Sequence, residues 1–174
     1  MKRYRYRYLC EGESEQKLIQ VLKEKNLLLS GKVEIFNFAQ NKVAKIIRKF
    51  SKSDYLLIVL DTDIINSDIF CQNITLLNKK KITYCIIAQN KNLEDELRIS
   101  CQLNSNNQLF RKFYNTSSIR EFKEKLIKDN NLYNKLQKNS FDIAKLWVLS
   151  NLPIKCDIHF IICQSNLYKR KNNE

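Results

Sequence analysis

Two short groups of acidic residues carry the strongest sign of chemistry in this sequence. The first group, residues 11–15, reads EGESE, and the second, residues 61–63, reads DTD. Crowding carboxylates of like charge costs free energy unless a cation pairs with them. Carboxylate oxygens beside an open edge are the ligands that Mg²⁺ or Mn²⁺ takes when it also binds a phosphate. The two groups therefore predict a site for Mg²⁺ or Mn²⁺.

The spacing within each group indicates how the carboxylates would be presented. On an extended chain alternate side chains point the same way, so we expect Asp61 and Asp63 to face one side together. Glu11 would stand at the end of a strand, and Glu15 one turn later, where the helix dipole favours a carboxylate. Acidic residues also cap helices in the ordinary way, so each group alone is weak. Their joint occurrence after two strands of one sheet is the more specific signal.

The elements that must position these residues follow from hydrophobic periodicity, which alternates between strand and helix patterns up to residue 101. Strands are expected at 4–10, 33–38, 55–60 and 82–88, and helices at 14–22, 43–50, 67–80 and 93–101. The unbroken apolar run 55–60 is typical of a central parallel strand covered on both faces. This order predicts an α/β fold, a mostly parallel sheet with helices on both faces.

The last third of the chain shows weaker patterns. A capping-box pattern at Ser118 predicts a helix that buries Phe122 and Leu126. A second helical piece is expected at 140–149 and a short edge strand at 157–163. We interpret residues 1–105 as the catalytic core, and 106–174 as a C-terminal extension of helices and a strand that completes the same domain.

Length and hydropathy exclude several classes of protein. A chain of 174 residues suits one compact domain. It has no apolar run of about 18 residues or more, so no membrane span is expected. The basic N-terminus leads directly into a strand-like segment without an apolar signal region. We therefore expect a cytoplasmic protein with no membrane partner.

The charge balance favours a polyanionic partner, DNA or RNA. Lys and Arg number 31 against 18 Asp and Glu, which gives a formal net charge of +13. However, 23 of the cations are Lys and the chain has 20 Asn, a bias that an AT-rich genome imposes on any surface. The triplet 79–81 is accordingly expected to be a solvated helix end. Charge alone does not decide the function.

The cysteines do not indicate a metal site. All six stand at irregular spacings with no C-x-x-C pair, and His159 is the single histidine. Zinc sites need a cluster of such ligands, so we expect the cysteines to pack as small hydrophobic residues.

The acidic groups also carry a resemblance. Residues 10–15 (CEGESE), followed about fifty residues later by 60–63 (LDTD), resemble the Toprim domain of topoisomerases, primases and small nucleases. Glu15 and the later segment 92–97 (NLEDEL) are more similar to the OLD-type and RloB-like branch, which is found in phage defence. The resemblance covers residues 4–100 and implies a Rossmann-like sheet.

Carried over by position, the resemblance implies a role for each acidic residue. Glu11 would be a metal ligand or a general acid/base, and Asp61 and Asp63 would hold one divalent ion. Glu15 and Glu94 would complete a second metal position. Two ions about 4 Å apart can activate water and stabilise the leaving oxygen of a phosphodiester. The neighbours of these residues, Glu13, Asp95 and Glu96, are expected to be solvated.

The resemblance also implies a basic residue near the attacked phosphate, for which Lys145 is the candidate. OLD-type nucleases carry an ATPase domain, but this sequence has no Gly-rich phosphate loop. A separate partner ATPase or a homo-oligomer is therefore expected if the chain does not act by itself.

The function expected is a Toprim-type, Mg²⁺- or Mn²⁺-dependent nuclease acting on DNA or RNA, in prokaryotic phage defence. Two alternatives stay open. One is a small RNA-processing Toprim ribonuclease, and the other is a catalytically idle subunit that binds nucleic acid or a partner. A receiver-like phosphoacceptor domain fits poorly, because Glu11-Gly12 has no place in its pattern.

Overall fold

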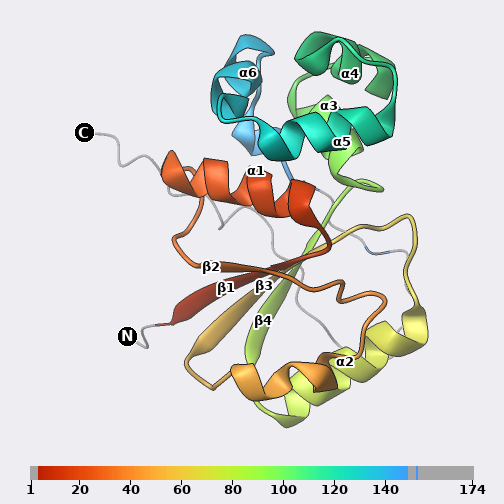
Figure 1. Cartoon of the computed structure of the whole chain (residues 1–174). Helices are drawn as coiled ribbons and strands as arrows, with labels where there is room; N and C mark the ends of the chain where they lie inside the picture. The colour runs from red at the N-terminus through yellow and green to blue at the C-terminus, as the bar shows by residue number, and fades with distance from the viewer. Residues whose placement is uncertain (1–3, 149–151, 153–174) are drawn as a thin grey trace.

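A parallel four-stranded sheet forms the centre of the molecule (Figure 1). The computed structural model describes residues 4–148 and residue 152. The strands are β1 (Arg5–Cys10), β2 (Lys32–Ile35), β3 (Asp54–Leu60) and β4 (Thr83–Ala88), in the spatial order β2-β1-β3-β4. Every neighbouring pair is parallel. The predicted α/β class, a parallel sheet between helices, is confirmed.

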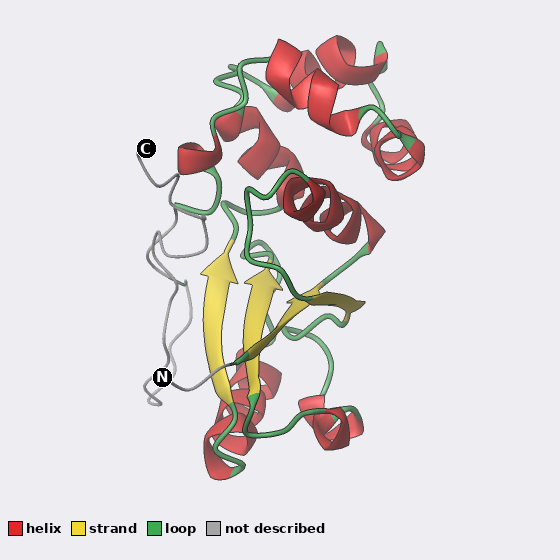
Figure 2. Cartoon of the chain, turned by 90° about the vertical axis from the view of Figure 1, so that its left-hand side faces the viewer, coloured by secondary structure: helices red, strands yellow, loops and turns green. Residues whose placement is uncertain are grey.

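Side-chain alternation along the central strand builds a core on each face of the sheet. Leu57 and Val59 of β3 face one core, while Leu56, Ile58 and Leu60 face the other. The first core is covered by α1 (Glu13–Glu24), and the second by α2 (Ser67–Lys79) and two 3₁₀ turns, η1 (Val43–Lys45) and η2 (Ile47–Lys49). Figure 2 shows helices above and below the strands. Burial on both faces explains the continuous apolar run.

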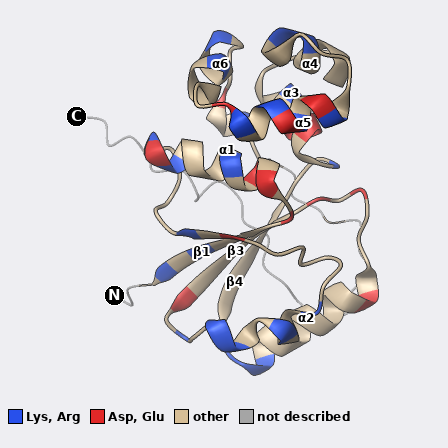
Figure 3. Ribbon diagram, viewed as in Figure 1, with Lys and Arg blue, Asp and Glu red and all other residues tan. Residues whose placement is uncertain are grey.

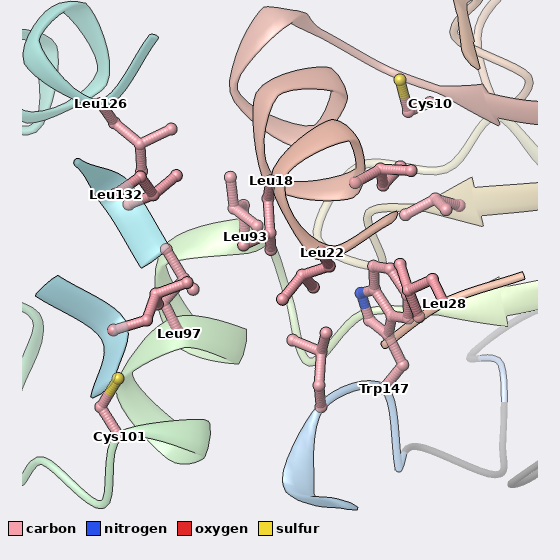
Figure 4. Packing of buried hydrophobic residues seen from close by; sticks show 14 of the residues in the cluster. Cys10, Leu18, Leu22, Leu28, Leu93, Leu97, Cys101, Leu126, Leu132 and Trp147 are labelled. Carbon is pink, nitrogen blue, oxygen red and sulfur yellow. The ribbon is translucent and has the colours of Figure 1, made fainter. Parts of the chain in front are cut away.

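The helices that follow β4 stack on α1 rather than on the sheet (Figure 1). They are α3 (Leu93–Ser100), α4 (Asn106–Tyr114), α5 (Ile119–Lys128), α6 (Leu132–Lys138) and the 3₁₀ turn η3 (Ile143–Lys145). Their apolar faces join the core over α1, and Figure 4 shows Leu18 of α1 beside Leu93 of α3, and Leu126 of α5 beside Leu132 of α6. This packing fixes α3 and α5 above the carboxyl ends of the strands.

Two expected elements in the first half differ from the structure. The helix expected at 43–50 is the pair of 3₁₀ turns, since Asn73 Oδ1 accepts the Val43 N–H at 2.7 Å and holds the segment against α2. A segment of eight residues is also too short for a stable helix of its own. The second strand ends at Ile35 rather than at Phe38, because its partner β1 ends at Cys10.

The prediction of one helix over 140–149 is wrong for the described part of that range. Ser140 has a left-handed backbone, φ 57, which ends the preceding α6. Asp142 then caps η3 by accepting the Ala144 N–H at 2.9 Å. Helix α4 was not expected from the sequence at all, although Ser105 caps it by accepting the Gln108 N–H at 3.2 Å. The strand expected at 157–163 lies outside the described residues.

Buried cysteines are part of the core under α1, as their places in apolar runs suggested for Cys10 and Cys85. Cys10 and Cys101 are buried and free. Cys71 and Cys85 are disulfide-bonded, so the expectation of free packing thiols is wrong for these two. No helix in the ranges that the structure describes is long and apolar enough to cross a membrane.

Candidate functional site

The two acidic groups lie at the point where the order of the strands in the sheet reverses, between β1 and β3. From β1 the chain continues to β2 on one side, and then crosses to β3 on the other side of β1. Loops after β1 and β3 therefore diverge, and a crevice between them is where open α/β sheets bind ligands. Glu11 follows β1 and Asp61 follows β3 directly. Figure 3 shows the acidic ribbon collected at this end of the strands.

Glu11 and Asp61 are direct neighbours across this crevice. The Asp61 backbone N–H donates to Glu11 Oε1 at 3.3 Å. Burial, with repulsion from Glu15 and Asp63, raises the pKa of Glu11 to about 7. Burial, with repulsion from Glu15 and Glu11, raises the pKa of Asp61 to about 8. Both raised pKa values mean that the surroundings of these carboxylates contain too little positive charge to stabilise their ionised forms.

Two amide side chains orient these carboxylates. Asn37, in the loop after β2, donates from Nδ2 to Glu11 Oε2 at 2.8 Å. Gln89, the fully buried residue after β4, donates from Nε2 to Asp61 Oδ1. Gln89 Oε1 accepts in turn from Trp147 Nε1 at 3.4 Å. The ends of all four strands thus contribute a side chain to the crevice.

Glu15 lies in the first turn of α1 and is buried, with 5% of its surface exposed. Its carboxylate folds back over Gly12, where an added Cβ would lie 3.1 Å from Glu15 Oε2. A side chain at this position would therefore have to displace the Glu15 carboxylate slightly, whereas the backbone angles of Gly12 are extended and open to any residue. Burial raises the pKa of Glu15, and nearby Lys123 opposes this effect. The helix start holds this carboxylate as expected.

Glu94, at the start of α3, meets a lysine that reaches it from α5. Lys123 Nζ lies 3.3 Å from Glu94 Oε1, and only 1% of the Glu94 side chain is exposed. Neither carboxylate oxygen accepts a well-directed hydrogen bond from a described residue. Although burial works against its charge, Glu94, Glu15 and Asp61 raise the pKa of Lys123. Lys123 is thus the cation that faces the acidic cluster.

Asp63 stands further out than the spacing predicted. Strand β3 ends at Leu60 and the chain bends over residues 62–64, so the extended backbone assumed for Asp61 and Asp63 is not found, although the charge of Asp63 still acts to raise the pKa of both Glu11 and Asp61. The N–H groups of Thr62 and Asp63 both point to the Lys91 carbonyl oxygen, at 2.7 and 3.3 Å. Asp63 is exposed and accepts from Asn92 Nδ2 at 3.3 Å. It lies at the rim of the site.

The other residues singled out from the sequence lie apart from this cluster or have structural roles. Lys145 is partly exposed on η3, and its role stays a prediction. Glu13 is exposed as expected, but the solvated position expected for Glu96 is wrong. Glu96 is fully buried and accepts the N–H groups of Asn90 at 2.6 Å and Trp147 at 2.8 Å. It ties the segment after η3 to the loop after β4.

The donors present suit a hard divalent cation in chemical type. Both Glu94 oxygens are buried without a well-directed hydrogen bond, and burial, together with repulsion from neighbouring carboxylates, raises the pKa values of Glu11 and Asp61. As the side chains are arranged, no three acidic, Cys or His groups in the described ranges converge on one point. Side-chain rotation at Glu15 or Asp63 would be needed to close a coordination shell.

Three polar residues of the site were missed from the sequence. Gln89 directly follows an apolar strand, the same signal that identified Asp61, and could have been found by position. Asn37 follows a strand whose end was misplaced, so its position gave no signal. Lys123 comes from α5, about thirty residues beyond α3 in the chain. Only the packing of α5 against α1 brings it over the strand ends.

No protein-family model matches the chain, and neither a curated protein nor a solved structure matches it significantly. The site must be interpreted from its own geometry.

Proposed function

We propose that this protein is a metal-dependent phosphodiesterase of the Toprim type that acts on DNA or RNA. The observation that carries the proposal is the cluster of half-buried Glu11 and Asp61 with buried Glu15 and Glu94, four carboxyl groups that face a single cation, Lys123, among the described residues. Unpaired buried carboxylates are costly, and a site for a cation is the ordinary reason to keep them. The short motifs and the strand order support the same family.

The chemistry can be assigned to residues. Glu11 and Asp61 would hold one Mg²⁺ or Mn²⁺ with Asp63, and Glu15 and Glu94 would hold a second. Bound ions would polarise the phosphate and lower the pKa of an attacking water. If Glu11 does not hold the ion, its pKa of about 7 would let it act as the general acid or base near neutral pH instead.

Lys123 supports the proposal as the basic partner of the phosphate. Its ammonium lies beside Glu94 and near Asp61, where it can neutralise charge on a phosphate oxygen. Lys145 was the sequence candidate for this role, but the contacts of Lys123 with the acids favour Lys123. Action within prokaryotic phage defence, with a partner ATPase, is part of the proposal through the family resemblance only.

A second candidate function is favoured by the same lysine. Lys123 already supplies one positive charge inside the acidic cluster, and the carboxylates do not converge as they stand. A protein that uses this fold only to bind nucleic acid or a partner, without cleavage, would not need a complete metal site. The two functions differ in whether Mg²⁺ or Mn²⁺ binds and cleavage follows.

The deciding experiment is cleavage of labelled single- and double-stranded DNA and RNA with Mg²⁺ or Mn²⁺. Asp61→Asn keeps the shape of the side chain and removes its charge. We expect it to lower the cleavage rate at least about a hundredfold. Asp68→Asn, at an exposed position of α2, is the matched control and should cleave like the wild type. Cleavage unaffected by Asp61→Asn would overturn the proposed site, and absence of any cleavage would favour the binding function.

A further inference from the structure

A second charged surface lies at the opposite end of the sheet from the acidic cluster. Two segments meet there, residues 47–54, which lead into β3, and 78–82, which lead into β4, and β3 and β4 are neighbours with Tyr55 paired to Thr83. The surface, here called the basic end, consists of six exposed cations: Arg48, Lys49, Lys52, Lys79, Lys80 and Lys81. Figure 3 shows the blue ribbon gathered around the end of α2.

The basic end is not balanced by nearby acids. Asp54 is the one acidic residue in the two connections, and it is fully buried. Its carboxylate accepts hydrogen bonds from Arg7 Nε at 3.1 Å and from the Ser51 backbone N–H at 2.7 Å. None of the six cations forms a salt bridge with another residue in the described ranges. Their charges therefore add to one positive field.

Helix-end chemistry explains only part of this surface. Lys79 lies in the last turn of α2, where the helix dipole favours a cation. Lys80 and Lys81 lie beyond the helix, and Arg48, Lys49 and Lys52 come from a different connection. A solvated helix end, the expectation from the sequence, does not account for two connections that present cations to the same place.

The cations surround a cavity of about 210 Å³. Arg48, Lys52 and Lys80 stand at its walls with Ser51, and Ile47, Phe50 and Ile82 form its apolar part. No acidic side chain of the described residues lines it. An apolar floor within a ring of cations suits a phosphate attached to a sugar or base, because the cations bind the charge and the floor packs against the organic part.

We propose that the basic end binds the phosphate backbone of a nucleic acid, as a contact separate from the acidic cluster. This proposal rests on the proposed function, because the proposed function names nucleic acid as the class of partner. Strand β3 has seven residues, so the two ends of the sheet are about 20 Å apart, or roughly six base pairs of duplex. A strand held at the basic end can therefore extend to the acidic cluster.

The shape favours nucleic acid over an anionic membrane. A membrane-binding face presents apolar side chains outward beside its cations. Here Phe50 and Ile82 are 9% and 6% exposed and lie within the cavity instead. Separate phosphates along a backbone fit cations that stand on two connections around a hollow.

The test compares two triple variants that remove the same charges. Arg48→Gln/Lys52→Gln/Lys80→Gln changes the basic end, and Arg111→Gln/Lys112→Gln/Lys138→Gln changes exposed positions on α4 and α6. Binding of fluorescent DNA and RNA oligonucleotides is measured by anisotropy in EDTA, so that no probe is cleaved. We expect the first variant to bind about ten- to a hundredfold more weakly, with a salt slope lower by about 2–3. The second should bind like the wild type.

Three other outcomes would overturn the proposal. Equal losses in both variants would mean that net charge alone attracts nucleic acid, and no loss in the first would place the contact elsewhere. Binding to phosphatidylserine vesicles without binding to oligonucleotides would point to a membrane. Unchanged thermal unfolding of both variants shows that the fold is kept. Binding through the basic end without any cleavage in Mg²⁺ would retain this inference and reject the nuclease.

Discussion

Lys123 Nζ on α5 lies 3.3 Å from Glu94 Oε1 on α3, although 29 residues separate them in the chain. Glu94 is almost completely buried, whereas 42% of the Lys123 side chain is exposed. The ion pair joins a helix of the strand-end crevice to a helix of the C-terminal layer. It is also the point at which the acidic cluster receives its positive charge.

Removing the Lys123 ammonium should destabilise the fold when no metal is present. Lys123→Met leaves a buried carboxylate without a cation, so we expect the free energy of unfolding to fall by about 2–3 kcal/mol, less than for a fully buried pair. Lys125→Met is the matched control, since Lys125 is equally exposed on α5 and pairs with the exposed Glu121. It should cost less than about 1 kcal/mol. Urea unfolding measures both, and equal losses would contradict the assigned role of Lys123.

The stability of the metal-free protein should fall as the pH rises from about 4 to 8. The pKa of Glu11 is raised from 4.5 to about 7 and that of Asp61 from 3.8 to about 8. The folded protein therefore binds more protons than the unfolded chain in this range. The resulting contribution to stability is complete below the pKa values of the unfolded chain and is lost as the pH rises through those of the folded protein. Thermal unfolding across this range is the measurement. Asp61→Asn should flatten the curve, whereas exposed Glu24→Gln should not; an unchanged slope in Asp61→Asn would reject the pKa assignment.

Mn²⁺ or Mg²⁺ should raise the unfolding temperature, and by more at pH 8 than at pH 6. Deprotonated carboxylates bind the ion, and an ion that binds only the folded state stabilises it by mass action. EDTA should reverse the shift, and Asp61→Asn should abolish it. Differential scanning fluorimetry at both pH values provides the readout. A shift of equal size in the variant would mean that the ion binds elsewhere.

Glu96 should be required for the packing of the segment around Trp147. Glu96→Ala leaves the buried N–H groups of Asn90 and Trp147 unsatisfied, so we expect a loss of about 3–5 kcal/mol. Glu96→Gln keeps one acceptor oxygen and should cost less. Trp147 is the single tryptophan and is 4% exposed, so its fluorescence should shift to the red in Glu96→Ala. Asp95→Ala, which removes the partly exposed pair with Arg98, should leave the emission unchanged.

Several parts of this protein are determined by local sequence. The apolar run of β3 and the 3.6-residue period of α2 fix these elements, because burial on two faces or on one stripe leaves a direct pattern. The same patterns place Glu11 and Asp61 after strands of one parallel sheet, and hence at one edge. The α/β class and the position of the candidate site follow from this alone.

The tertiary structure alone decides what surrounds those carboxylates. Lys123 and Trp147 reach the site through packing between distant segments, and side-chain contacts of that kind leave no periodic pattern in the sequence. Glu96 shows the same limit, since three consecutive acids at the start of a helix do not reveal which of them a later segment covers. The basic end likewise exists because parallel pairing of β3 and β4 brings two separate connections together. Local sequence sets the elements and their charges, and long-range packing determines which charges meet.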